Sequence, residues 1–158
     1  MTAPSTLKTP SSWAKAIADT LQDRQIDPVP IFKDLNMDYG LLAGTNPDKD
    51  TYYLQDDVTR LWNAAAEISG DPYFGLQAGQ RIQATSYPVL GYSLMSCHNL
   101  KESCLRMFRY QRLLAEGLMF KVIDNGDEYC LHVDILPSTM TASIQAHDAA
   151  CTSILGFI

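Results

Sequence analysis

The sequence predicts an α+β domain that is mostly helical and carries one small antiparallel sheet. Apolar side chains recur with helical spacing along most of the chain. An Asn125-Gly126 pair between two apolar runs marks a β-hairpin over about 118–136. With 46% hydrophobic and 19% charged side chains, 158 residues can bury one core. We therefore expect a flexible N-terminal tail over 1–11 and a single domain over 12–158.

The first predicted helix begins at Ser12, whose hydroxyl suits the N-cap position. Its apolar face consists of Trp13, Ala16, Ile17, Thr20 and Leu21. Pro28 ends the helix, because a proline disfavours helical geometry in the residue before it. A short helical turn over 30–36 and a Gly-, Pro- and Asp-rich loop over 43–50 are expected to follow.

Two helices separated by a glycine are expected next. Asp56 and Asp57 suit the positive end of a helix dipole. The apolar stripe that follows them is Val58, Leu61, Trp62, Ala65 and Ile68. Gly70 is the expected C-cap. Asp71-Pro72 then restarts a helix that runs to about Gly79, with the aspartate as N-cap and the proline in the first turn.

A short apolar helix is expected to open at Tyr87-Pro88, and Asn99 is expected to cap a longer one. The predicted buried stripe of the longer helix is Leu100, Cys104, Met107, Phe108, Leu114 and Ala115. On the opposite arc lie Arg106, Arg109 and Arg112. Charges at this spacing are typical of a solvated face, and they also suit an anion or partner site.

A two-residue turn at Asn125-Gly126 fixes the register of the predicted hairpin. The apolar face then pairs Leu118 with Val133, Phe120 with Leu131 and Val122 with Tyr129. The mixed face pairs Met119 with His132 and Lys121 with Cys130. Because two strands are only marginally stable alone, a third is needed, and residues 51–54 are the best candidate.

A last helical stripe runs to the final residue without a cap or a polar tail. It consists of Ile144, Cys151, Ile154, Leu155 and Ile158. We therefore expect more protein to follow this chain.

Charge excludes some functions for this stretch of sequence. Twelve basic and eighteen acidic residues give a net charge of −6, whereas binding to phosphates requires a basic excess. Neither nucleic acid nor an anionic membrane is therefore an expected direct partner. The N-terminal residues lack the apolar run of a secretory signal, and no run is long enough to span a membrane. A cytoplasmic location with reduced cysteines is expected.

We find no motif for catalysis, a metal or a cofactor. The patterns G-x-S-x-G, G-x-G-x-x-G and H-E-x-x-H and the P-loop are missing. Cys97, His98 and Cys104 lack a recurring ligand spacing. We expect no cofactor and no metal, while an enzyme with a site assembled from scattered residues stays open as an alternative.

Large, flexible or amphipathic side chains gather on the elements expected to pack around the hairpin. They suit a small-molecule cavity as well as a plain core. We place a pocket between the hairpin and the helices at 88–97 and 99–115. Its predicted apolar walls are Tyr92, Met95, Phe108 and Tyr129, and its predicted polar anchor is His132. A histidine in an apolar strand needs a hydrogen-bond partner, which either a ligand or the protein can supply.

Several short segments together resemble a known family. They are Leu61-Trp62, the run Gly70-Asp-Pro-Tyr-Phe-Gly-Leu76, Leu90-Gly91-Tyr92, Ser96-Cys-His-Asn-Leu100 and Arg109-Tyr110. In this order they resemble the N-terminal, arabinose-binding-like ligand-binding domain of AraC-family transcription regulators, in the subgroup typified by the ornithine-utilisation regulator. The resemblance spans residues 15–158. It departs from the family at Tyr87-Pro88, where Phe-Gly is expected.

The resemblance implies a cytoplasmic bacterial sensor of a small-molecule effector. It also implies a following C-terminal domain, absent from this chain, in which helix-turn-helix units bind promoter DNA. Since such regulators usually pair to match repeated half-sites, Arg106, Arg109 and Arg112 become a predicted homodimer surface. No sugar-binding motif is visible, and the effector is open. A stand-alone small-molecule carrier or scaffold is the other alternative.

Overall fold

The computed structural model describes residues 6–43, 51–83 and 86–157. These residues form seven α-helices, one 3-10 helix and two antiparallel sheets of two strands each, which confirms the predicted α+β class. The helices are α1 (Ser11–Asp23), α2 (Val29–Asp34), η1 (Tyr39–Ala43), α3 (Gln55–Ser69), α4 (Phe74–Gly79), α5 (Pro88–Met95), α6 (Leu100–Leu114) and α7 (Ile144–Phe157). The strands are β1 (Lys8–Pro10), β2 (Tyr52–Leu54), β3 (Leu118–Asp124) and β4 (Tyr129–Ile135).

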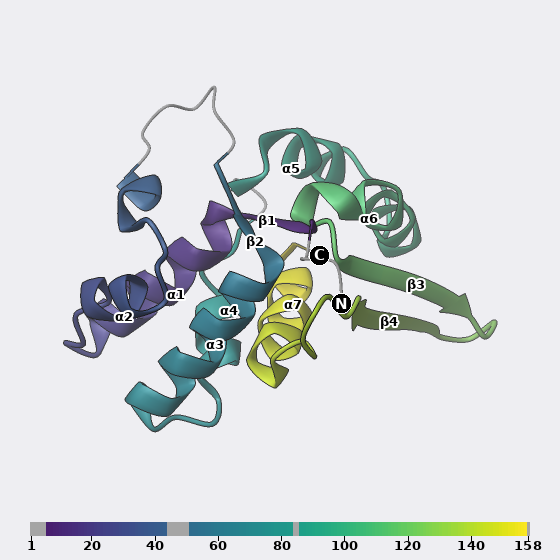
Figure 1. The fold of residues 1–158 in the computed structure, drawn as a ribbon. Coiled ribbons are helices and arrows are strands. Elements are labelled where there is room, and N and C mark those ends of the chain that lie inside the picture. The colour runs from purple at the N-terminus through teal and green to yellow at the C-terminus, as the bar shows by residue number, and fades with distance from the viewer. Residues whose placement is uncertain (1–5, 44–50, 84–85, 158) are drawn as a thin grey trace.

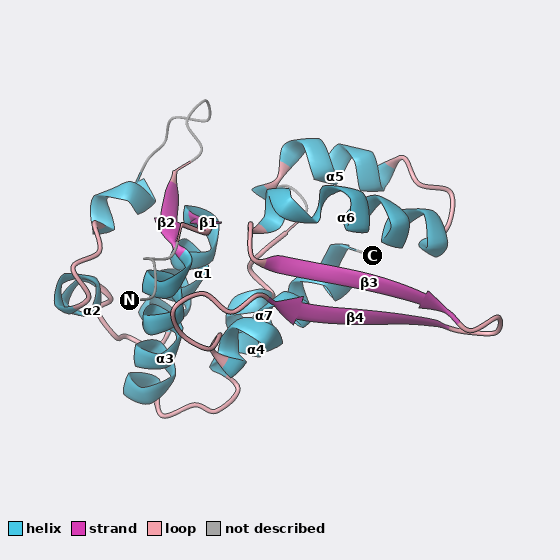
Figure 2. Cartoon of the chain, turned by 45° about the vertical axis from the view of Figure 1, so that its right-hand side comes forward, coloured by secondary structure: helices cyan, strands magenta, loops and turns pink. Residues whose placement is uncertain are grey.

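Helix α7 lies between two groups of elements (Figure 1). On one side α1 packs on α3, and α4 packs on both of them and on α7. On the other side α6 packs on β3, and α5 packs on α6. Figure 2 shows α5 and α6 stacked along one side of the long hairpin. The last helix therefore contacts the helical group through α3 and α4 and the hairpin through β4.

The predicted third strand does not join the hairpin. β2 pairs instead with β1, in the register Lys8 with Leu54 and Pro10 with Tyr52. Residues 8–10, assigned from sequence to a flexible tail, are thus part of a sheet, and Ser11 already belongs to α1. The Glu116 amide also donates to the Lys8 carbonyl at 3.1 Å, which ties β1 to the end of α6. This pairing joins segments far apart in sequence, so local patterns did not reveal it.

The four-residue connection of the hairpin differs from the predicted two-residue turn. The Asn125 amide donates to the Glu128 carbonyl at 3.0 Å, and the Asp124 carboxylate accepts from the Gly126 amide at 2.9 Å. The register moves by two residues, so Phe120 pairs with Val133, Lys121 with His132 and Met119 with Asp134. Because the shift is even, each side chain keeps its predicted face. The shift also brings Ile135 opposite Leu118 on the apolar face.

Two of the four predicted helix caps are confirmed. Gly70 ends α3 with φ at 65°, and the Asn99 side chain accepts from the Glu102 amide at 2.9 Å. Ser12 is not an N-cap, because Pro10 takes that position and the Ser12 hydroxyl pairs with the Tyr87 hydroxyl. The Asp71 prediction is also wrong. Its carboxylate accepts from the Tyr73 amide and pairs with Arg24, so that α4 begins only at Phe74.

Two predicted buried stripes are partly wrong. On α6, Leu100 and Phe108 are about half exposed, while Cys104, Met107 and Leu114 are buried. On α7, Ile144, Cys151 and Leu155 are exposed, and the buried face carries mostly small or polar side chains instead. That face consists of Gln145, Ala149, Ala150, Ser153, Ile154 and Phe157. Ile158, the last residue of the predicted stripe, lies outside the described residues.

The small residues of α7 are explained by its close approach to α4. A Cβ on Gly79 would lie 2.5 Å from the Ala149 carbonyl oxygen, and one on Gly75 would overlap the Gln145 backbone. The Gln145 side chain also accepts from the Gly75 amide at 2.7 Å and donates to the Pro72 carbonyl at 3.1 Å. Backbone contact and a bridging amide therefore fix α7 against the start of α4.

Candidate functional site

A small cavity lies where α1, α3, α7 and the base of the hairpin meet. We call it the junction cavity. Its lining consists of Thr9, Trp13, Gln55, Val58, Thr59, Trp62, Ala115, Leu118, Ile135, Ala146 and Ala150. Its volume is about 40 Å³, more than the roughly 10–15 Å³ that one water molecule needs. The lining residues come from β1, α1, α3, β3, β4 and α7, and Ala115 directly follows α6.

Two hydrogen bonds, one buried and one partly buried, hold the walls of the junction cavity. The Trp13 indole donates to the Leu114 carbonyl at 2.8 Å, which fixes α1 to the end of α6. The Gln55 amide donates to the Leu136 carbonyl at 2.7 Å, which fixes the first turn of α3 to the residue that follows β4. On α7, Ala146 and Ala150 face the cavity one turn apart. The last helix is therefore a direct wall of the cavity.

The polar groups of the cavity are neutral. Thr9 is 7% exposed and Thr59 is 4% exposed, and neither hydroxyl makes a hydrogen bond with the described part of the chain. Because both residues line the cavity, a ligand or water bound there can form hydrogen bonds with these hydroxyls. None of the described side chains that line the cavity carries a charge.

Asp56 lies beside this wall but does not line the cavity. One carboxylate oxygen accepts from the Thr139 hydroxyl, and the other is buried without a partner among the described residues. Its place in the first turn of α3 puts the carboxylate near the positive end of the helix dipole.

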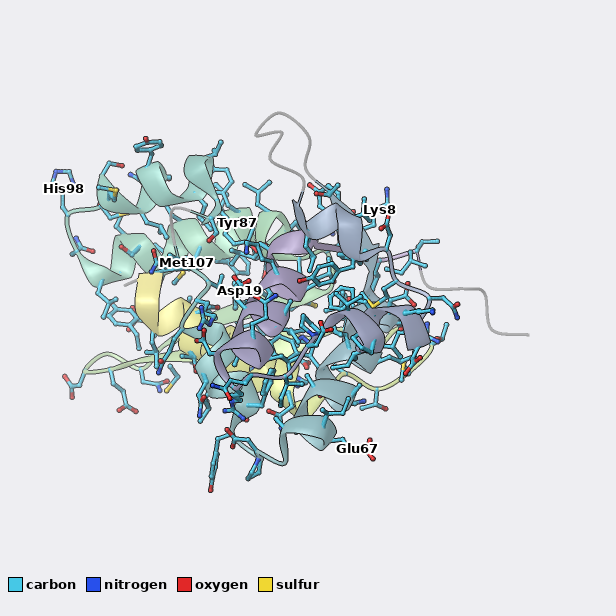
Figure 3. The ribbon with its side chains drawn as sticks, turned by 90° about the vertical axis from the view of Figure 1, so that its left-hand side faces the viewer. Lys8, Asp19, Glu67, Tyr87, His98 and Met107 are labelled. Atoms are coloured by element: carbon cyan, nitrogen blue, oxygen red, sulfur yellow. The ribbon has the colours of Figure 1, made fainter. Side chains whose placement is uncertain are left out.

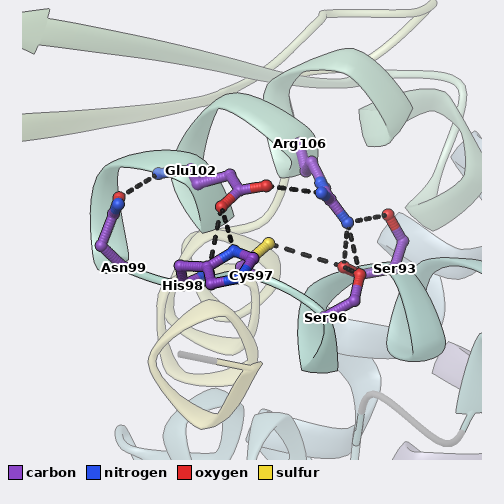
Figure 4. Close-up of polar contacts among 7 residues, drawn as sticks. All are labelled: Ser93, Ser96, Cys97, His98, Asn99, Glu102 and Arg106. Atoms are coloured by element: carbon purple, nitrogen blue, oxygen red, sulfur yellow. Dashed lines mark hydrogen bonds and ion pairs between the residues drawn. The ribbon is translucent and has the colours of Figure 1, made fainter.

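A second, more open pocket lies at the elbow between α5 and α6 and offers about 410 Å³. Arg106, which does not line this pocket, joins the two helices: it donates to the Ser93 carbonyl at 2.5 Å, the Ser96 hydroxyl at 2.6 Å and the Glu102 carboxylate at 2.5 Å (Figure 4). The His98 amide donates to Glu102 at 3.0 Å, and together with the Arg106 charge it lowers the pKa of the Glu102 carboxyl. These contacts hold the two helices at a fixed angle.

The structure does not bring the five predicted pocket residues together. Tyr92 and Met95 are 75% and 79% exposed on the outer side of α5, and Phe108 is 47% exposed on α6. Tyr129 and His132 are exposed on opposite faces of β4. Met95 borders the elbow pocket, and none of the five lines the junction cavity. Their role as ligand-binding residues stays a prediction.

The three arginines of α6 differ in their surroundings. Arg106 is engaged within the elbow, whereas Arg109 and Arg112 are exposed. Leu105, also exposed, lies on the same outer side of the helix, four residues before Arg109. The structure thus leaves a mixed apolar and basic surface on α6, and its role as a dimer surface stays a prediction.

Sequence reasoning missed every residue that lines the junction cavity as a site residue. Thr59 and Ala150 read as ordinary members of buried helix faces, and Thr9 lay in the predicted tail. The available signal was the spacing of small or polar residues in otherwise apolar stripes, at Gln55 and Thr59 on α3 and at Ala146 and Ala150 on α7.

Some other kinds of site are not found in the described residues. No group of three or more His, Cys, Asp or Glu side chains there is placed to hold a metal ion. Cys97, Cys104, Cys130 and Cys151 are free thiols. His98 points away from the body of the molecule (Figure 3), and its imidazole lies 3.5 Å from the Glu102 carboxylate. No helix in the described ranges has the length and apolar character that crossing a membrane demands.

An α+β domain with an uncharged internal cavity, two unpaired hydroxyls in its lining and a terminal helix as one wall has the properties of a ligand-sensing domain. A family model described as the arabinose-binding domain of AraC transcription regulators, N-terminal, matches residues 33–158. The match covers most of the chain, so the chain belongs to this family. The resemblance seen in the sequence is confirmed, and the chain is a ligand-sensing regulatory domain.

A relative with a curated name supports the same assignment. The ornithine utilization regulator of Pseudomonas aeruginosa is 26% identical over 131 residues. The aligned region covers 81% of this chain and 37% of the relative. The chain thus spans little more than a third of the length of that protein.

Proposed function

We propose that this domain binds a small-molecule effector in the junction cavity and passes the binding event to a DNA-binding domain through α7. In this proposal the complete protein is a cytoplasmic transcription regulator rather than an enzyme or a stand-alone carrier. Promoter DNA is contacted only by the other domain, since this chain has a net charge of −6. The relative's length, of which the aligned region covers 37%, leaves room for such a domain.

The observation that carries the proposal is the double role of α7. One side of this helix packs on the α4 backbone, and another contributes Ala146 and Ala150 to the cavity. A molecule in the cavity therefore contacts the last described helix without an intermediary. A ligand shifts the equilibrium between two states only by the difference in its affinity for them. Because α7 lines the cavity, a ligand bound there can favour a state in which α7 has a different position.

Substitution within α7 tests the proposal. In a promoter reporter with the complete regulator, Ala150→Leu fills the cavity from the α7 side and should abolish the response to effector. Cys151→Leu adds the same side chain at a neighbouring exposed position and should keep the response. Equal responses from both variants, at equal protein levels, would place the effector site elsewhere.

The same proposal includes a homodimer that pairs through the exposed side of α6. Leu105 and Phe108, 51% and 47% exposed, supply apolar area there, and Arg109 and Arg112 supply charge. Two-fold pairing would match the repeated half-sites that dimeric regulators bind. Arg106 supports this surface indirectly, because it fixes α5 against α6.

A further inference from the structure

We infer that the ligand of the junction cavity is a compact, uncharged and largely apolar molecule with one or two hydrogen-bonding groups, rather than a sugar or a charged amino acid. This inference rests on the proposed function and specifies its effector class. It depends on three properties of the lining: its polar groups, its charge and its volume.

The polar groups can satisfy only a few hydrogen bonds. Thr9 and Thr59 offer two unpaired hydroxyls, while the Gln55 amide nitrogen is already bonded to the Leu136 carbonyl. A sugar carries a hydroxyl on nearly every carbon. Most of those hydroxyls would be buried against Trp13, Trp62 and aliphatic side chains without a partner, and each would incur a desolvation penalty.

The charge of the lining excludes ionic ligands. No described side chain that lines the cavity is charged, and an uncompensated charge in an apolar cavity is strongly unfavourable. Asp56 is one of several charged residues next to a lining residue in the sequence, as are Lys8 and Glu116, and none of these three lines the cavity. Thr139 also occupies one of the Asp56 oxygens.

The volume of the cavity favours a small ligand that moves a wall. A cavity of about 150 Å³ holds a benzene ring, whereas the junction cavity offers about 40 Å³. A single ring can enter only if the residues that line the cavity move apart. Ala146 and Ala150 belong to that lining, so a ring-sized ligand favours a state in which α7 has shifted.

Phenol is a suitable probe because it combines one ring with one hydroxyl. We expect millimolar phenol to raise the Tm of the purified chain, by about 5–10 °C at 100 times its Kd. Thr59→Val keeps the side-chain shape and removes the hydroxyl, so it should weaken phenol binding about tenfold. Thr152→Val, whose hydroxyl bonds to the Asp148 carbonyl within α7 outside the cavity, should bind phenol like the parent.

The remaining measurements separate failure of the ligand class from failure of the site. L-arabinose and L-ornithine serve as the polar and charged probes, and Ala150→Leu fills the cavity. If either of these probes raises the Tm and phenol does not, and the effect is lost in Ala150→Leu, the cavity is the sensor but the ligand class is wrong. If Ala150→Leu leaves every ligand-induced shift intact, both the site and the ligand class are overturned. The absence of any shift with phenol also overturns the inference.

Discussion

At the scale of single residues, glycines decide how closely two helices approach. Gly75 and Gly79 allow α4 to touch the backbone of α7 at Gln145 and Ala149. Both belong to an apolar helix in which alanine would otherwise be preferred. Their conformational cost in a helix is therefore offset by close packing that a Cβ would prevent.

Gly75→Ala should lower the free energy of unfolding by about 3 kcal/mol or more, because backbone atoms cannot yield as a flexible side chain does. Gly156→Ala is the matched control. An added Cβ there meets nothing within 4 Å, and helix propensity predicts a gain of up to about 1 kcal/mol. Urea denaturation of the two variants measures both values, and similar stabilities would show that α4 and α7 do not pack this closely.

The sequence predicted some of these residue-level features and not others. Gly70 and Asn99 act through neighbours within three positions, so their capping roles could be recognised locally. Ser12 bonds instead to Tyr87, which is distant in the sequence, and the Asp71 carboxylate bonds both to the nearby Tyr73 amide and to the distant Arg24. Capping rules consider only hydrogen bonds between a side chain and the backbone near it in the sequence. They do not include partners that the tertiary fold brings close.

At the scale of elements, the elbow between α5 and α6 depends on one ionised carboxylate. Glu102 accepts from the His98 amide and from Arg106, and its pKa is lowered. A carboxyl whose pKa is lower in the folded state stabilises the fold above its unfolded pKa. That stabilisation is lost as the pH falls through the folded value.

Glu102→Gln should therefore be less stable than the parent at pH 7. The difference should shrink once the pH falls below the ordinary glutamate pKa of about 4.3, and it should disappear below the lowered pKa of the folded carboxyl. Chemical denaturation across pH 3 to 7 measures this convergence. Asp127→Asn, at an exposed hairpin position, controls for general charge removal. A stability gap for Glu102→Gln that is constant with pH would contradict the role of the ionised carboxylate.

Helix positions were predicted better than strand partners. The apolar stripe of α3 and the long α6 were evident because helical contacts are local. The hairpin faces were also correct, since an even register shift preserves them. The partner of β2 could not be predicted, because β1 is more than 40 residues away and pairs through its backbone. The junction cavity was missed for the same reason, since its lining comes from five separate segments.

At the scale of the whole molecule, charge reversal on α6 tests the proposed dimer. Arg109→Glu should shift the parent from dimer to monomer at micromolar concentration, because it removes the guanidinium of the paired surface and brings a carboxylate against the apolar Leu105 and Phe108. Lys33→Glu makes the same change at an exposed position on α2 and should leave the dimer intact. Sedimentation velocity measures the mass of each species. A monomeric parent, or a dimer that survives Arg109→Glu, would refute pairing through this surface.

The packing of α4 on α7 has a consequence for how the chain emerges from the ribosome. The glycine face of α4 has its main partner in α7, which begins at Ile144. At about 5–20 residues per second, synthesis of the intervening chain takes roughly 3–13 s. During that interval α1, α3 and α4 lack the helix that completes their core. Nascent chains of this domain are therefore expected to need protection by chaperones until translation has passed α7.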